Sequence, residues 1–180
     1  METRSAFRKF SVFLSGVLAL AGAHPFLAAA AQTEGEPEEA KINFILSKMD
    51  EGIRQAFQKA WQISGGGIAD VEGVVLLYRQ RDGSLRATPL GRTNERLQST
   101  FQWNYAILAI VHTHPNHHDP RPGGEDSRIA DRFDVPVFTI TSRGMFVYNP
   151  RTRKIAKVFN GMEWHNPARQ TWEATLAVKK

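Results

Sequence analysis

Two histidines and an aspartate are spaced along this chain as the ligands of a single metal ion would be. The chain reads His112-Thr113-His114-Pro115, and Asp126 follows after a loop rich in proline and glycine. Imidazole and carboxylate groups are common zinc ligands, and three of them leave a fourth position open, as in catalytic zinc sites. The sequence therefore predicts a Zn²⁺ site held by His112, His114 and Asp126.

A strand must bring the two histidines together. Residues 105–111 are apolar and rich in branched side chains, which predicts a buried strand that ends at the histidines. Residues two apart on a strand share a face, so His112 and His114 can reach one ion. Pro115 then ends the strand, and the loop after it gives the backbone room to bring Asp126 back.

A carboxylate interrupts another apolar segment. Glu72 lies in residues 71–78, a pattern typical of a strand apart from this acid and Gly73. Burying an unpaired carboxylate costs free energy, so such a group is usually paired, set near a metal, or exposed at a strand end. Two interpretations stay open for Glu72: a carboxylate that is paired or set near the metal, or a solvent-facing carboxylate.

Together these residues resemble the JAMM zinc metallopeptidases, also called the JAB or MPN+ family. That family has an upstream Glu, then His-x-His-Pro, seven residues and Ser-x-x-Asp, and the spacing here agrees. One residue departs from the pattern, because Gly123 stands where the family has Ser. An offset pair, Ser127 with Asp131, restores the Ser but has the wrong spacing and lies in a predicted helix, so Asp126 is preferred.

The resemblance covers residues 41–160 and implies a zinc-dependent hydrolase of peptide or isopeptide bonds. By this resemblance Glu72 activates the zinc-bound water, and the family's Ser helps to orient that water or the oxyanion. Gly123 therefore bears on catalysis and not on metal binding. Residues 71–90 look like the opening hairpin of the JAB-type domains found in exported bacterial proteins.

Two other functions stay open. The first is a noncatalytic JAB-like module that binds a peptide or protein, which the absence of the Ser at Gly123 favours. The second is a metal-buffering protein that uses the neighbouring His117, His118 and Asp119, with several weak sites. We expect His117 and His118 to be exposed to solvent and not to be ligands of the main site.

The N-terminus has the pattern of an export signal. Basic residues at Arg4, Arg8 and Lys9 precede a mostly apolar stretch over residues 10–27, and an alanine run at 28–31 supplies the small residues that signal peptidase requires. A retained membrane anchor is the alternative. We expect a periplasmic or secreted protein with no stable membrane anchor after cleavage.

Composition narrows the remaining classes. With no cysteine, the chain can have no disulfide framework, no thiolate zinc ligand and no lipidated cysteine. Removing residues 1–31 would remove three of the 23 basic residues and one of the 18 acidic ones, leaving a net charge of +3. No long Lys/Arg block is present, so we predict no nucleic-acid partner. A peptide or protein is the expected substrate, and the oligomeric state stays open.

The patterns predict one α/β domain with a mixed sheet and flanking helices. We divide the chain into a signal peptide (1–31), an acidic flexible linker (32–40), the JAB/MPN-like domain (41–160) and a polar C-terminal segment (161–180). One helix is predicted over residues 42–61, ended by the Ser64-Gly65-Gly66-Gly67 run, and another from near Asp126 to Phe133. Besides residues 71–78 and 105–111, strands are predicted at 85–90, 135–140, 145–148 and 154–159.

Overall fold

The computed structural model describes residues 9–13, 38–90 and 98–165. Most of the predicted signal peptide, most of the predicted linker and the chain after residue 165 therefore lie outside the described residues. The helices and strands that carry the predicted metal ligands lie inside them.

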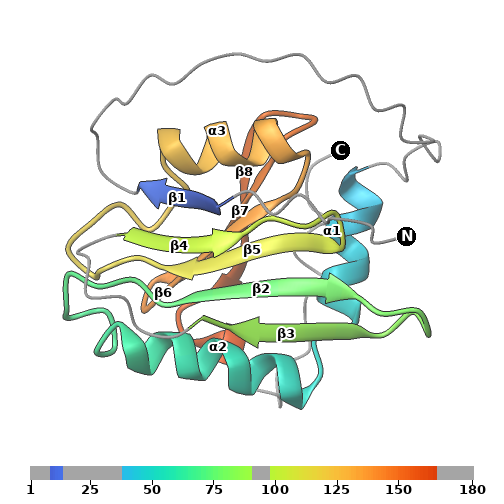
Figure 1. The fold of residues 1–180 in the computed structure, drawn as a ribbon. Coiled ribbons are helices and arrows are strands. Elements are labelled where there is room, and N and C mark those ends of the chain that lie inside the picture. Colours follow the sequence, from blue (N-terminus) through green and yellow to red (C-terminus); the bar gives the residue numbers. More distant parts are fainter. Residues whose placement is uncertain (1–8, 14–37, 91–97, 166–180) are drawn as a thin grey trace, which may run out of the picture.

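A six-stranded mixed sheet forms the centre of the molecule, in the order β3-β2-β5-β6-β7-β8 (Figure 1). Only β5 and β6 run parallel in this sheet, and the other neighbours are antiparallel. Each strand matches a segment predicted from the sequence, and the predicted α/β class with flanking helices is confirmed. The strands are β2 (Val74–Arg79), β3 (Leu85–Pro89), β5 (Ile107–Thr113), β6 (Val137–Thr141), β7 (Gly144–Asn149) and β8 (Lys154–Asn160).

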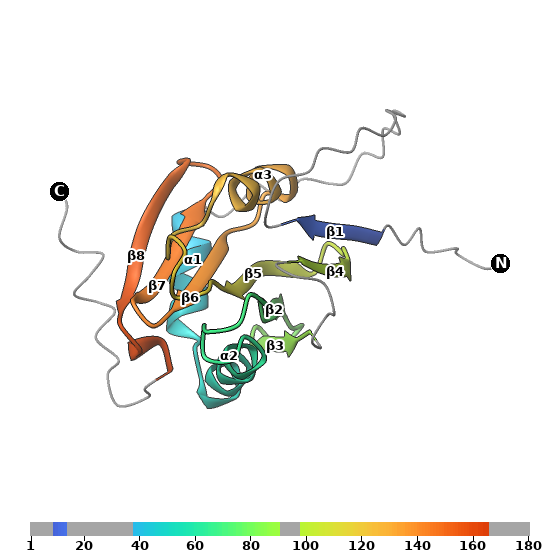
Figure 2. The same ribbon diagram turned by 90° about the vertical axis from the view of Figure 1, so that its left-hand side faces the viewer.

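The two faces of the sheet are covered differently. Helices α1 (Glu38–Ser47) and α2 (Glu51–Ile63) pack on one face, where Ala109 and Val111 of β5 point. Helix α3 (Gly124–Phe133) covers the other face, where Ile110 points (Figure 2). Since residues alternate along a strand, His112 follows Ile110 toward the α3 face.

The predicted single helix over residues 42–61 is wrong, because the chain breaks it into α1 and α2. The Asp50 carboxylate accepts a hydrogen bond of 2.9 Å from the Ile53 N–H, an N-cap that begins α2. Ile45, Met49 and Ile53 are all buried on both sides of the break. Their helical spacing hid it in the sequence. Helix α1 also begins at Glu38, inside the predicted linker.

Two strands were not predicted. β1 (Lys9–Phe13) and β4 (Gln98–Gln102) form a separate antiparallel pair that lies on the α3 side of the sheet (Figure 2). β1 falls within the predicted signal peptide. In this structure a segment that signal cleavage would remove is therefore the hydrogen-bonding partner of β4.

The packed domain extends past residue 160, where the sequence suggested that it would end. The short 3-10 helix η1 (Glu163–His165) holds Trp164, which is fully buried in the α1/α2 core. The Trp164 indole N–H donates to the Thr141 carbonyl at 3.0 Å, and Arg54 donates to the Trp164 carbonyl at 3.0 Å. None of the described helices is both long and apolar enough to cross a membrane.

Candidate metal centre

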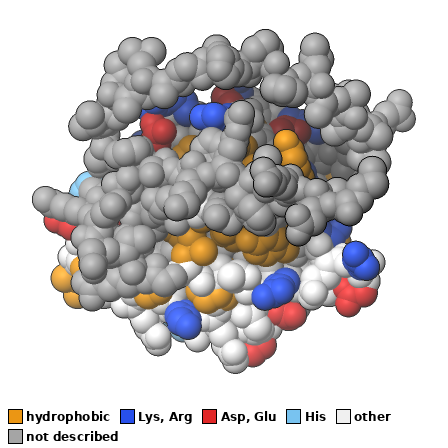
Figure 3. Space-filling view, in the orientation of Figure 1, with side chains coloured by type: hydrophobic (Ala, Val, Ile, Leu, Met, Phe, Trp, Pro, Cys, Tyr) orange, Lys and Arg blue, Asp and Glu red, His pale blue; other side chains and the backbone are white. Residues whose placement is uncertain are grey.

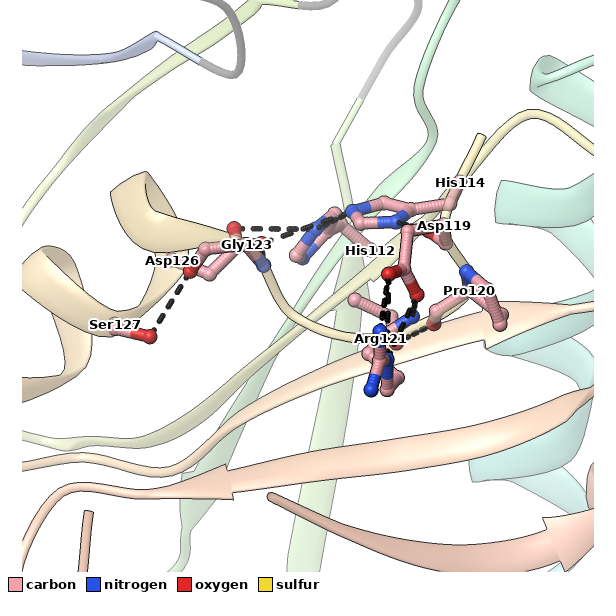
Figure 4. Close-up of polar contacts among 9 residues, drawn as sticks. His112, His114, Asp119, Pro120, Arg121, Gly123, Asp126 and Ser127 are labelled. Carbon is pink, nitrogen blue, oxygen red and sulfur yellow. Dashed lines mark hydrogen bonds and ion pairs between the residues drawn. The ribbon is translucent and has the colours of Figure 1, made fainter. Parts of the chain in front are cut away.

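The three predicted ligands converge on one buried point. The Nε2 atoms of His112 and His114 are 3.0 Å apart, and His112 Nε2 lies 3.2 Å from Asp126 Oδ1 (Figure 4). His114 Nε2 lies 3.7 Å from Asp126 Oδ2, and all three residues are buried. Two imidazoles and a carboxylate with their ligand atoms so close together form a possible metal-binding triad.

Two elements position these side chains. His112 lies within β5, paired with Val74 of β2 and Thr139 of β6, and the His114 N–H donates to the Ile140 carbonyl at 3.2 Å. Asp126 comes from the first turn of α3 on the same face of the sheet. Strand and helix therefore present the two kinds of ligand to each other.

The backbone selects the tautomer of His114. Its Nδ1 lies 2.7 Å from the Asp119 carbonyl oxygen, which can only accept a hydrogen bond. Nδ1 must therefore carry the proton, and in the neutral ring Nε2 keeps its lone pair directed at the cluster. An imidazole held this way by a carbonyl is the usual arrangement around protein-bound metals.

Asp126 is held in its ionised form. Burial alone would raise the pKa of this carboxyl, but the neighbouring imidazoles, His112 more than His114, outweigh burial and hold the pKa well below its usual range. The Gly123 N–H also donates to Asp126 Oδ2 at 2.6 Å, at the N-terminus of α3, where a negative charge is favoured. Asp126 is thus a charged group prepared to face a cation.

Glu72 lies just before β2 and is only 5% exposed. Its Oε2 has no hydrogen-bond partner among the described residues. Burial, followed by the negative charge of Asp126, raises the pKa of Glu72 well above its usual value. The alternative of a solvent-facing carboxylate is wrong, and a buried carboxyl with an unused oxygen stands near the triad.

A close contact fixes the backbone next to Glu72. The Gly73 N–H donates to Thr113 Oγ1 at 2.8 Å, and the Thr113 N–H donates to the Gly73 carbonyl at 3.0 Å. A Cβ at Gly73 would lie 2.1 Å from the Ala60 carbonyl oxygen of α2, which no side chain can tolerate. Glycine here lets α2 and β5 hold the segment that carries Glu72 in one position.

Two positions bear on the Ser that this chain lacks, namely Gly123 and the offset Ser127. A Cβ at Gly123 would find Asp126 Oδ2 at 3.7 Å, an ordinary contact, so the site has room for a side chain there. Ser127 instead donates to the Gly123 carbonyl at 2.9 Å, and Asp131 accepts a hydrogen bond from the Tyr148 hydroxyl at 3.0 Å. The offset pair of Ser127 and Asp131 is therefore not part of the centre.

An apolar wall lies behind the triad. A cavity of about 10 Å³ adjoins His112 and Asp126, near the lower limit for one water molecule. Its other lining residues are Val74, Phe101, Ile110, Ile129 and Val137. Because water is largely excluded on this side, charges in the centre are weakly screened and act strongly on one another.

The loop histidines lie outside this centre, as expected. The His117 side chain is 59% exposed, and its Nε2 lies 3.3 Å from Asp70 Oδ1. The Asp119 carboxylate, which the sequence grouped with them, instead binds the Arg121 guanidinium, at 2.7 Å for its shortest contact. Sequence reasoning missed Asp70 as their neighbour, since nothing in the local pattern links residues so far apart.

Neither known protein families, nor curated proteins, nor solved structures gave a match when this chain was compared with them. The evidence for function is therefore the geometry of Glu72 and the triad, together with the motif in the sequence.

Proposed function

We propose that this protein is a zinc-dependent hydrolase that cleaves a peptide or isopeptide bond. One observation carries the proposal: the buried Glu72, with an unused carboxyl oxygen, is close enough to Asp126 of the three converging ligands for the charge of Asp126 to raise its pKa. A structural metal site would have no use for this acid. The resemblance to the JAMM metallopeptidases supports the same function.

The residues fit zinc in number and in kind. Two imidazoles and one carboxylate, His112, His114 and Asp126, would hold the ion and leave a position open. In this family of sites, bound zinc lowers the pKa of water from 15.7 to about 7 and polarises a carbonyl. The hydrogen bond from His114 Nδ1 to the Asp119 carbonyl keeps Nε2 available for the ion.

Glu72 is proposed as the group that moves the proton. Its pKa is raised toward neutral pH, and a general base works best when its pKa lies near the working pH. The positive charge of a bound cation would partly oppose that rise. The carboxylate would take a proton from the attacking water and return it to the leaving amine. Burial excludes bulk water, which would otherwise compete for this proton.

A noncatalytic JAB-like module that binds a peptide or protein is the second candidate. The observation that favours it is Gly123, which offers no hydroxyl to orient water or an oxyanion at the place where the resembled family has Ser. Under this alternative the metal would stabilise the loops, and Glu72 would have no proton to transfer.

The export-signal pattern in the sequence supports a periplasmic or secreted site of action, and we propose that the protein meets its peptide or protein partner there. Nucleic acid is a poor fit. Where the described residues are visible on the face in Figure 3, Lys and Arg side chains lie among Asp and Glu side chains.

Metal analysis and a peptidase assay test the proposal together. Purified protein should contain about one tightly bound zinc, and a panel of linear and cross-linked peptides should include one that it cleaves. Glu72→Gln should keep the zinc and lose cleavage, while Glu125→Gln, which removes a carboxylate bonded to Arg128 on α3, should keep both. Cleavage that survives Glu72→Gln would refute the role of Glu72.

The binding module predicts a different pattern. Wild type, Glu72→Gln and Gly123→Ser would then bind the same peptide with equal affinity, and none would cleave any peptide in the panel.

A further inference from the structure

We propose that Asp70, His117 and His118 form a second site, which binds a divalent transition-metal ion at the protein surface. One ligand atom from each residue lies within 4.8 Å of the others. His117 Nε2 is 3.3 Å from Asp70 Oδ1, and the two imidazole rings meet edge to face with centroids 4.5 Å apart. This cluster shares no residue with the buried triad.

The cluster joins two loops that are already fastened together. Asp70 belongs to the loop between α2 and β2, and the histidines belong to the loop after β5. Asn116 connects the loops, because its N–H donates to the Gly67 carbonyl at 2.7 Å and its side-chain amide donates to the Gly66 carbonyl at 3.1 Å. Hydrogen bonds between the two loops therefore hold the three ligands close together.

The backbone that carries the histidines is held as well. The His118 N–H donates to the Pro115 carbonyl at 3.0 Å, and the His118 carbonyl accepts a hydrogen bond from the Arg143 guanidinium. Ser142 Oγ donates to Asn116 Oδ1 at 2.6 Å. A site whose ligands are already positioned loses less conformational entropy when an ion binds, so its affinity is higher.

The ligand types select the class of ion. Two imidazoles with one carboxylate suit Zn²⁺, Ni²⁺ and Cu²⁺, whereas Mg²⁺ and Ca²⁺ prefer oxygen ligands. Exposure of His117 and His118 leaves room for water to complete the coordination. The nearby Asp119 carboxylate is held by Arg121, which makes this residue a suitable control.

An ion at the surface site would hold together the two loops next to the buried centre. The Asp70 loop continues directly to Glu72, and the histidine loop continues directly from His114. Occupancy of the surface site would therefore tie together the two segments that carry the proposed base and a proposed ligand. This effect needs no change in the ligands of the buried site.

Equilibrium dialysis of the full chain against Zn²⁺, and separately against Cu²⁺, tests the site. Wild type should bind a second ion more weakly than the first. Asp70→Asn, His117→Ala and His118→Ala should each weaken the second ion by at least about 10- to 100-fold, the loss that follows removal of even an outer partner of a metal site. Asp119→Asn should keep both ions, and circular dichroism should show that every variant is folded.

His114→Ala separates the two sites. It should lose the tight ion and keep the weaker one, so a failure of the proposed hydrolase and a failure of the surface site give different results. The surface site is refuted if wild type never binds more than one ion, or if Asp119→Asn weakens the second ion as much as Asp70→Asn does.

Discussion

Two clusters in this molecule have the same ligand types, but one is buried and the other lies at the surface. Each has two imidazoles and one carboxylate, but His112, His114 and Asp126 are buried, while His117 and His118 are exposed. The buried cluster also has an apolar wall on one side and Glu72 nearby. The surface cluster is reached directly by solvent.

Ligand type alone therefore does not separate a catalytic metal site from a simple binding site. Hydrogen-bonded loops can bring suitable side chains together at a surface, where water screens their charges. A reaction needs in addition a positioned acid or base and a site from which bulk water is excluded. On these grounds we propose chemistry at the buried cluster and only metal binding at the exposed one.

The greatest change in rate is expected when the Glu72 carboxylate beside the buried cluster is removed, and removal of the Asp70 carboxylate of the surface cluster is the comparison. Glu72→Gln should lower the rate of peptide hydrolysis by about 10²- to 10⁴-fold, because it removes the proposed proton acceptor while it keeps the shape of the side chain. Asp70→Asn should leave the rate of the zinc-loaded protein within about threefold, since Asp70 is not proposed to transfer a proton and general-base effects of that size do not apply to it. Initial rates on one cleaved peptide compare the two. Equal losses in both variants would remove the distinction between the clusters.

The next effect tests the backbone that supports the buried cluster. Gly73→Ala should lower the free energy of unfolding by about 1 to 3 kcal/mol or more, because its Cβ would overlap the Ala60 carbonyl of α2. Gly124→Ala is the matched control, with no atom within 4 Å of the added Cβ, and should change stability by less than about 1 kcal/mol. Urea unfolding measures both, and equal stability of the two variants would contradict the close contact.

The pH dependence of the metal-free protein gives a smaller effect. The folded protein holds the Glu72 proton above the ordinary pKa of 4.5, so ionising this carboxyl favours unfolding as the pH rises. Wild type should therefore lose stability relative to Glu72→Gln above about pH 4.5, by about 1.4 kcal/mol for each tenfold difference in the proton's dissociation constant between folded and unfolded chain. The pKa of Asp126 is lowered in both wild type and Glu72→Gln, so its contribution cancels from the difference in stability between them.

Urea unfolding in the presence of a chelator, from about pH 5 to 8, measures this difference. A stability gap between wild type and Glu72→Gln that stays constant over this range would mean that Glu72 is not desolvated.

The smallest effect concerns the residue that departs from the family pattern. Gly123→Ser should fit without strain, since the added Cβ lies 3.7 Å from Asp126 Oδ2. Zinc content should stay the same, and the rate of hydrolysis should be unchanged or higher because a hydroxyl becomes available near the centre. A loss of zinc in this variant would show that Gly123 supports the ligand Asp126 more closely than we infer.

The sequence was sufficient for those features that depend on local pattern. The strands β2, β3, β5, β6, β7 and β8 and the helix α3 follow from runs of apolar residues and turn signals, and His112, His114 and Asp126 follow from their spacing. The break at Asp50 was missed because a buried stripe continues across it. The pairing of β1 with β4, and the approach of Asp70 to His117, depend on contacts between distant residues that no local pattern encodes.

The position of Trp164 bears on the order in which the molecule can be completed. Its carbonyl is bonded by Arg54, 110 residues earlier in the chain, and its indole fills the core beneath α1 and α2. A nascent chain emerging from the ribosome has all of its proposed zinc ligands by residue 126, yet it lacks this closing side chain. The core on the α1/α2 face, opposite the proposed metal centre, is therefore completed only after β8 and Trp164 have been made, and shortened chains that end before Trp164 should be less stable.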